Sequence, residues 1–269
     1  MLVGVTLRNM GPESTRAMMA DCVRVAEDRG FESVWITDHV AIPPDDAEGS
    51  GGRYVDPFAT LSWFAGLTSK IKLGAGVIVL PYRPPLVLAR QVAAVQELSA
   101  GRLLLGVGVG WMAAEFRAVG ADRRYRARDS DAALDFLNRC FATDVVEANG
   151  QPFLFKPRPP RPPVLVGGRP PHALERAARY GDGWLPMGLE PADVGPMRVR
   201  YREMTDRLDK PPGTITVMAG LPLYDRDASY DALNQYRVSG VDRLVCAIRY
   251  RTYTEYASAI GSLAAVCAR

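Results

Sequence analysis

Eight short apolar runs, each followed by a longer amphipathic stretch, are the feature that most limits how this 269-residue chain can fold. Several runs are continuously aliphatic or β-branched, which is typical of parallel strands covered on both faces. Eight strand–helix units in succession favour a closed barrel, and the length is close to the roughly 250 residues of one such barrel. We therefore predict an α/β fold, a single (β/α)₈ TIM barrel domain over residues 1–269. The expected strands are Leu2–Leu7, Ser33–Thr37, Lys72–Leu80, Leu103–Val109, Val164–Val166, Gly183–Pro186, Ile215–Ala219 and Arg243–Ile248.

The amphipathic stretches predict eight helices, and two connections break the regular pattern. Ala41–Arg53, rich in Pro, Asp and Gly, follows the second strand and would lie on the catalytic face of a barrel, as a mobile lid or as a plain flexible connection. Phe155–Pro163 is proline-rich and is predicted to be extended. The predicted helices are Thr15–Arg29, Pro57–Thr68, Leu86–Leu98, Asp129–Ala142, Ala173–Tyr180, Ala192–Leu208, Tyr230–Val238 and Tyr253–Val266.

Composition and missing motifs exclude several functions. A net charge of +3 gives no basic field for nucleic acid. The only histidines, His39 and His172, are far apart and in no metal-binding pattern, so we expect no metal. Neither a nucleophile elbow nor a P-loop sequence occurs, and Gly106, Gly108 and Gly110 lack the spacing of a Rossmann fingerprint.

The expected location is the cytoplasm. The four cysteines are scattered, as expected of reduced thiols rather than a disulfide framework. The N-terminus runs directly into a strand, with no basic segment before a long apolar stretch, and no apolar run is long enough for a bilayer. We therefore expect a protein without membrane association.

Polar residues at the end of the second strand are candidates for catalysis. Asp38 and His39 are adjacent there, so one can face the pocket while the other supports it. An aspartate at this position can also merely cap the next helix, and a single histidine is often structural.

Glycines interrupt three of the strands near their ends. Glycine inside a strand marks a bulge, a close approach of a ligand to the backbone, or tight packing. Three neighbouring sets together point to a flat ligand, and a Gly-Gly turn with an arginine before a helix suits a phosphate or carboxylate. The residues concerned are Gly74 and Gly76; Gly106, Gly108 and Gly110, followed by Trp111; and Gly167 and Gly168, followed by Arg169.

Several motifs together resemble the luciferase-like monooxygenase superfamily, and in particular its short branch dependent on the deazaflavin coenzyme F420. They are G-F-E-S-V-W-I-T-D-H, K-L-G-A-G-V-I-V-L-P-Y-R-P-P, G-R-L-L-L-G-V-G-V-G-W, P-V-L-V-G-G and Y-G-D-G-W-L-P, between about Val3 and Leu189. The resemblance implies a barrel of the bacterial-luciferase type, redox chemistry on a small organic substrate and a homodimer.

The resemblance also implies roles for individual residues. Asp38 would face the central ring of the cofactor, and His39 beside it would donate or accept a proton. Gly76–Val77 would form a non-prolyl cis peptide in a bulge that backs the ring. Gly108 and Gly110 would border the ring, and Gly167, Gly168 and Arg169 would hold the phosphate end.

One position departs from the family pattern and leaves the chemistry open. Several F420-dependent dehydrogenases carry a glutamate directly after the second strand-four glycine. Trp111 stands there in this chain, either lining a substrate pocket or packing beside the ring, and Glu115 is the nearest carboxylate. Hydride transfer with F420 is our preferred hypothesis. The alternatives are a monooxygenase that uses FMNH₂ from a separate flavin reductase, and a barrel that binds a flavin without catalysis.

Overall fold

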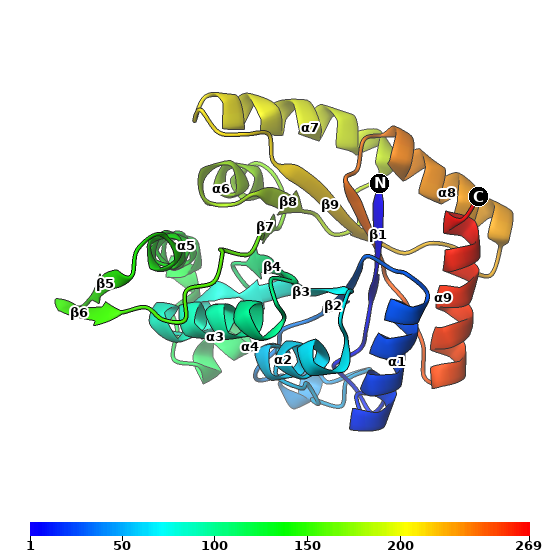
Figure 1. Ribbon diagram of the computed structural model, residues 1–269, viewed down its shortest axis with the longest axis horizontal. Coiled ribbons are helices and arrows are strands. Elements are labelled where there is room, and N and C mark those ends of the chain that lie inside the picture. The colour runs from blue at the N-terminus through cyan, green and yellow to red at the C-terminus, as the bar shows by residue number, and fades with distance from the viewer.

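Eight parallel strands form a closed barrel, which confirms the predicted fold (Figure 1). The structure is a computed structural model that describes residues 1–269. Around the barrel the strands follow the order β1-β10-β9-β8-β7-β4-β3-β2, each hydrogen-bonded to a parallel neighbour. Their bounds are β1 Leu2–Thr6, β2 Ser33–Ile36, β3 Lys72–Val79, β4 Leu103–Gly108, β7 Val164–Gly167, β8 Gly183–Leu185, β9 Thr214–Ala219 and β10 Arg243–Cys246.

All eight predicted helices are present, with ends within a few residues of those expected. Side-chain caps fix several starts: Thr15 accepts the amide hydrogen of Met18, and Asp56 accepts that of Ala59. None of the helices is both long enough and apolar enough to cross a bilayer. Their bounds are α1 Arg16–Asp28, α2 Pro57–Leu67, α3 Pro85–Leu98, α5 Arg126–Ala142, α6 His172–Tyr180, α7 Pro191–Asp206, α8 Arg226–Val238 and α9 Tyr253–Cys267.

Two elements were not predicted. A short helix, α4 (Ala113–Ala118), follows β4, and an antiparallel hairpin of β5 (Val145–Ala148) and β6 (Gln151–Leu154) projects away from the barrel (Figure 1). The hairpin turns at Asn149 and Gly150, both with positive φ. An Asn-Gly pair is the strongest short sequence signal for such a turn, so the hairpin could have been predicted.

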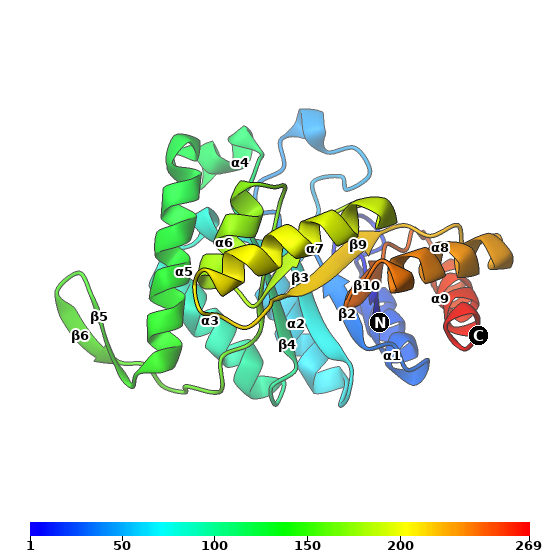
Figure 2. The same cartoon turned by 90° about the horizontal axis from the view of Figure 1, so that it is seen from above.

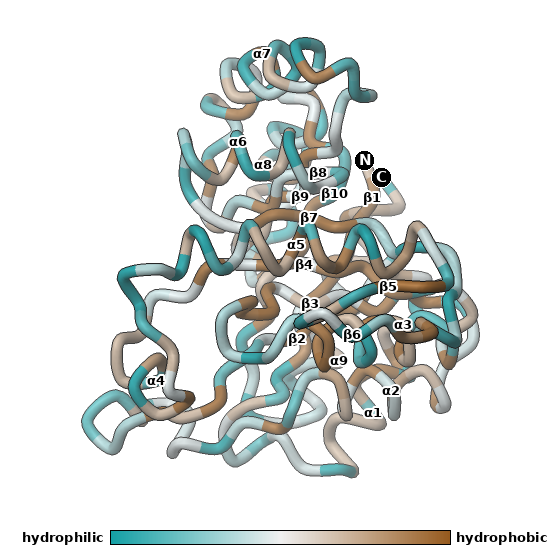
Figure 3. Tube along the Cα trace, turned by 90° about the vertical axis from the view of Figure 1, so that its left-hand side faces the viewer, coloured by the Kyte–Doolittle hydropathy of each residue, from teal (hydrophilic) through white to brown (hydrophobic).

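The barrel interior is filled by side chains that point inward from alternate strand positions. Trp35, Leu104, Leu165, Leu185 and Val245 form this inner cluster, separate from the larger core between strands and helices. Figure 3 shows hydrophobic segments gathered in the central strands, whereas α7 and the loops near α4 are largely hydrophilic. The interior is therefore a packed core, and any ligand must bind at one of its ends.

The N-terminal end of the barrel is closed by a buried ion pair. The guanidinium of Arg243 donates to both carboxylate oxygens of Glu32 at 2.8 Å and to the hydroxyl of Thr216 at 3.2 Å. Burial would raise the pKa of Glu32, but Arg243 holds it below its ordinary value. A ligand site is therefore expected at the opposite end.

A bulge interrupts β3 near the C-terminal end of the barrel. The pairing of β3 with β4 shifts register between Ala75 and Ile78, and the peptide bond between Gly76 and Val77 is cis, as the family resemblance implied. The bulge turns Val77 toward the inner cluster, where Met218 of β9 also packs. Val77 and Met218 thus form the upper surface of the packed interior.

Candidate active site

The candidate site is centred on Glu115, which lies in α4 at the C-terminal end of the barrel and is completely buried. Its Oε1 accepts the amide hydrogens of Val40 at 2.6 Å and Ala41 at 3.1 Å. Its Oε2 accepts the hydroxyl hydrogen of Tyr82 at 2.9 Å and lies 2.9 Å from Nδ1 of His39. Four groups from two other segments therefore converge on one carboxylate.

The same contacts fix the protonation of the site. Burial would raise the pKa of Glu115, but the amides of Val40 and Ala41, with His39, lower it below its ordinary value, so the group is a carboxylate at neutral pH. Burial, together with the hydrogen bond to Glu115, raises the pKa of Tyr82, so the phenol stays a donor. A carboxylate has no proton to give, so Nδ1 of His39 carries the hydrogen of their bond. Nε2 then makes no hydrogen bond with the protein and is left for a ligand.

Two aromatic rings lie next to the imidazole of His39. The Tyr54 ring lies 4.9 Å from it, tilted by 53°, and the Trp111 ring lies 6.3 Å away, nearly edge-on. His39 keeps 20% of its side chain exposed, and Trp111 is 64% exposed. The imidazole is thus oriented on one side by Glu115 and open on another.

Asp38 lies beside this pair but has a different environment. Its carboxylate is fully buried and accepts two hydrogen bonds from the guanidinium of Arg83, at 2.6 and 2.8 Å, and one from the amide of Val79 at 2.9 Å. Burial would lower the pKa of Arg83, but Asp38 raises it above its ordinary value, so the guanidinium stays charged. Neither oxygen of Asp38 is exposed to a ligand.

The strand glycines serve the packing of the barrel. A Cβ on Gly74 would lie 2.3 Å from the Trp35 ring, and one on Gly106 would lie 2.0 Å from the carbonyl oxygen of Ala75. Tight packing, the alternative raised from the sequence, thus accounts for these two positions. The neighbours are strands and side chains of the barrel itself.

Two of the glycines proposed to bind the cofactor make room for Val77. A Cβ on Gly108 would lie 2.6 Å from one methyl group of Val77, and a Cβ on Gly167 would lie 2.9 Å from the other. Gly110 has a φ of +75°, and a Cβ there would meet Val79 and Phe116 within 2.9 Å. Gly108 and Gly167 therefore let Val77 lie between them, and Gly110 makes room for Val79 and Phe116.

The proposed phosphate end lies after β7, next in the barrel to β4. Gly168 has a φ of +120°, and its carbonyl oxygen accepts the indole hydrogen of Trp184 at 2.9 Å. Arg169 is exposed; its carbonyl oxygen accepts the amide hydrogen of Ala173 at 3.2 Å, and its guanidinium makes no hydrogen bond or ion pair with the protein. His172 is exposed on α6 and lies 3.4 Å from Glu175, away from the pair of His39 and Glu115.

The proposed lid, Ala41–Arg53, is attached at several points. The amide of Ala41 donates to Glu115, the carbonyl oxygen of Gly49 accepts from Arg8 at 3.1 Å, and the guanidinium of Arg53 donates to Ser14 at 3.0 Å. Figure 2 shows this loop beside α4 at the upper edge of the molecule. The segment covers the C-terminal face in a defined conformation, and whether it opens stays a prediction.

Sequence reasoning found part of this site. Asp38 and His39 were named, and Glu115 was noted only as the nearest carboxylate. Tyr82 and Arg83 lie in the motif P-Y-R-P-P that follows the third strand, and Tyr54 directly follows the loop Ala41–Arg53. Their positions after predicted strands are the only sequence signal that they belong to the site. Their partners were not predictable from spacing, because each contact joins distant segments.

The chain belongs to the luciferase-like monooxygenase family, whose model matches residues 3–264. It is 31% identical over 177 residues to the F420-dependent hydroxymycolic acid dehydrogenase of Mycobacterium tuberculosis, covering 60% of this chain and 46% of that longer enzyme. In structure it is similar to monooxygenase RslO1 of Streptomyces bottropensis, with a TM-score of 0.82, 20% identity and 98% of each chain covered. An F420-dependent secondary alcohol dehydrogenase, solved with an F420–acetone adduct, gives a TM-score of 0.80 at 14% identity, with 98% of each chain covered. The protein is thus an enzyme of the luciferase-like oxidoreductases and monooxygenases.

Proposed function

We propose that this family member transfers a hydride between coenzyme F420 and a small organic substrate. The observation that carries the proposal is the pairing of His39 with the buried carboxylate of Glu115, which leaves Nε2 of the imidazole open at the barrel mouth. Such a pair is the arrangement expected of a general acid–base group. In this proposal the pair takes the role of the glutamate that several F420-dependent dehydrogenases carry at the position of Trp111.

Apolar side chains at the mouth of the barrel support a flat cofactor there. Val77 and Met218 are only partly buried, and Met187 and Trp111 are 58% and 64% exposed. Large apolar side chains exposed near one another are typical of a ligand site. The ring would lie over Gly76–Val77, bordered by Gly108 and Gly110. Its phosphate would lie toward Gly167, Gly168 and Arg169.

The chain's own residues have distinct proposed roles in the reaction. A bound deazaflavin supplies or accepts a hydride. His39 would move a proton to or from the substrate oxygen through Nε2, and Glu115 would hold Nδ1–H and stabilise the imidazolium form. Asp38 is a positioning residue, because its pairing with Arg83 fixes the backbone that precedes His39. Trp111 would line the substrate side.

A monooxygenase using FMNH₂ from a separate flavin reductase is the second candidate, favoured by the likeness to RslO1 over the whole chain. In that reaction His39 would serve the oxygenated substrate in the same acid–base role. The non-catalytic alternative loses support, because a barrel that only binds a flavin has no need of a buried carboxylate aimed at a histidine.

The cofactor is tested by titrating the purified protein with F420 and with FMN while following fluorescence quenching. We expect saturable binding of F420 at micromolar concentrations and weaker binding of FMN. Arg169→Gln should weaken the binding of the preferred cofactor about tenfold, since a charge-assisted contact is lost. The matched control is Arg200→Gln. Arg200 is an exposed arginine on α7 whose guanidinium makes no hydrogen bond or ion pair.

Tight FMN binding without a response to F420 would overturn F420 as the cofactor and favour the monooxygenase. An assay with NADH, a flavin reductase and oxygen then tests that reaction directly. If neither cofactor binds the wild-type protein, the proposed redox function is wrong.

A further inference from the structure

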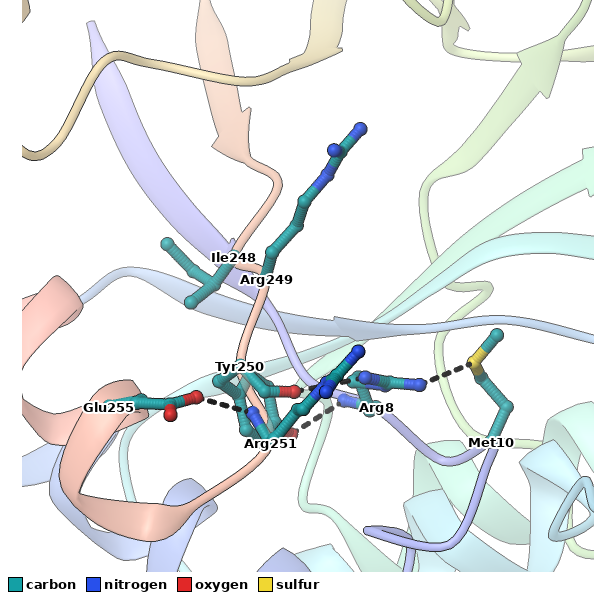
Figure 4. A pocket seen from close by; sticks show the side chains of 7 residues that line it. All are labelled: Arg8, Met10, Ile248, Arg249, Tyr250, Arg251 and Glu255. Atoms are coloured by element: carbon teal, nitrogen blue, oxygen red, sulfur yellow. Dashed lines mark hydrogen bonds between the residues drawn. The ribbon is translucent and has the colours of Figure 1, made fainter. Parts of the chain in front are cut away.

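An open cavity lies on the C-terminal face, in the segments that follow β1 and β10. Its volume is about 650 Å³, enough for a small organic molecule. β1 and β10 are adjacent in the barrel, and β8 and β9 separate β10 from β7, where the phosphate end of the cofactor is proposed. Figure 4 shows its lining residues, which are Arg8, Met10, Ile248, Arg249, Tyr250, Arg251 and Glu255.

Three arginines and one acid give this cavity an excess of positive charge. Arg8 is held in place: its guanidinium donates to the carbonyl oxygens of Tyr250 and Gly49 and lies 3.3 Å from Glu13. The only acid in the lining, Glu255, accepts the backbone amide hydrogen of Arg251 at 2.7 Å. It therefore caps the start of α9 and does not pair with an arginine side chain.

The guanidinium groups of Arg249 and Arg251 have no partner in the protein. Both are exposed, and neither guanidinium makes a hydrogen bond or an ion pair (Figure 4). Arg249 follows the end of β10, and Figure 4 shows its side chain pointing away from Arg8.

One residue of the lining is connected to the surroundings of His39. Met10 forms a backbone bridge with Tyr54, and the Tyr54 ring packs 4.9 Å from the imidazole of His39. The cavity and the acid–base pair therefore share a neighbouring strand segment at the same end of the barrel.

We propose that the cavity binds the carboxylate or phosphate group of the substrate, with Arg249 and Arg251 as the residues that select it. The unpaired guanidinium groups can each donate two hydrogen bonds to such an anion. Arg8, whose charge is paired with Glu13, lines the cavity beside them. This assignment rests on the proposed function, since it makes the substrate of that reaction an organic acid or a phosphate ester.

Binding of simple anions tests the assignment without knowledge of the substrate. Benzoate and phenylphosphonate are titrated by calorimetry into the protein with and without its cofactor, and benzamide serves as the neutral analogue. We expect both anions to bind and benzamide to bind at least tenfold more weakly. Arg249→Gln and Arg251→Gln should each weaken anion binding about tenfold, whereas Arg200→Gln should leave it unchanged. Glu255→Gln, which keeps a capping oxygen, should strengthen it a few-fold by removing the only negative charge of the lining.

Three results would overturn the assignment. Benzamide could bind as well as benzoate, or the anions could fail to bind in both states of the protein. Alternatively, Arg249→Gln and Arg251→Gln could weaken F420 or FMN binding as much as anion binding. The two arginines would then bind the cofactor and not the substrate. Failure of the redox function is separate, because it appears as loss of cofactor binding by the wild-type protein.

Discussion

Asp38 and Glu115 are two buried carboxylates at the same end of the barrel, and they differ in what compensates their charge. Asp38 pairs with a guanidinium that is charged at every accessible pH. Glu115 is surrounded by two amides, a phenol and an imidazole, none of which is a permanent cation.

This difference suits the two carboxylates to different roles, one structural and one in the reaction that we propose. The guanidinium of Arg83 keeps its charge, so its pair with Asp38 fixes the residues that follow β2. The pair of Glu115 and His39 gains a positive partner each time the imidazole is protonated. We propose that the less completely compensated carboxylate, Glu115, is the one that serves catalysis.

Asp38→Asn should have the largest effect on stability. It leaves Arg83 buried beside a neutral amide, and breaking a buried pair in this way typically costs about 3–5 kcal/mol. The free energy of unfolding is measured by urea denaturation. The matched control is Asp56→Asn, since Asp56 is half exposed and 3.5 Å from the same guanidinium, and asparagine caps α2 equally well. Equal losses in the two variants would contradict the scaffold role.

His39→Gln should have the largest effect on activity. Loss of a general acid–base group lowers the rate about 10²- to 10⁴-fold, and we expect a stability change within about 1 kcal/mol because the side chain is partly exposed. The rate of cofactor oxidation and the urea midpoint are measured together. His172→Gln, which alters the only other histidine, should change neither. A His39→Gln enzyme with wild-type activity would remove the imidazole from the mechanism.

Glu115→Gln should have an intermediate effect that depends on pH. The folded protein lowers the pKa of Glu115 below its ordinary value of 4.5, so this carboxylate stabilises the fold above pH 4.5 and loses that contribution as the pH falls through its folded pKa. The variant should be about 1–3 kcal/mol less stable at pH 7. The gap from wild type should narrow below pH 4.5, as measured by urea denaturation across pH.

A gap between Glu115→Gln and wild type that stays constant down to pH 3 would contradict an ionised Glu115. The same variant should also lower the rate, because Nδ1 of His39 loses the carboxylate that orients the imidazole. Loss of stability without a loss of rate would make Glu115 a purely structural residue.

Tyr82→Phe should have the smallest effect. It removes one of four hydrogen bonds to Glu115 and costs about 1 kcal/mol, with a rate loss of only a few-fold. Tyr224→Phe is the control, because Tyr224 is 94% exposed. If the two variants behave alike in urea and in the rate assay, Tyr82 contributes nothing to the orientation of Glu115.

Much of the fold was predictable, because apolar period and strand count determine a barrel without knowledge of distant contacts. Asp38 and His39 were predictable for the same reason, since they follow a recognisable strand. The pairing of His39 with Glu115 was not, because the two residues are 76 positions apart and meet only when α4 folds back. The strand glycines showed the limit of local reasoning: Gly74 and Gly106 make room for Trp35 and Ala75, which the sequence does not reveal.

The two amides that Val40 and Ala41 donate to Glu115 have a consequence for the loop they begin. If the loop moved away, the carboxylate would lose two donors and its affinity for a proton would rise. By reciprocity, a proton on Glu115 weakens the attachment of the loop by the same free energy. Opening of this loop would therefore be coupled to proton uptake by one buried carboxylate.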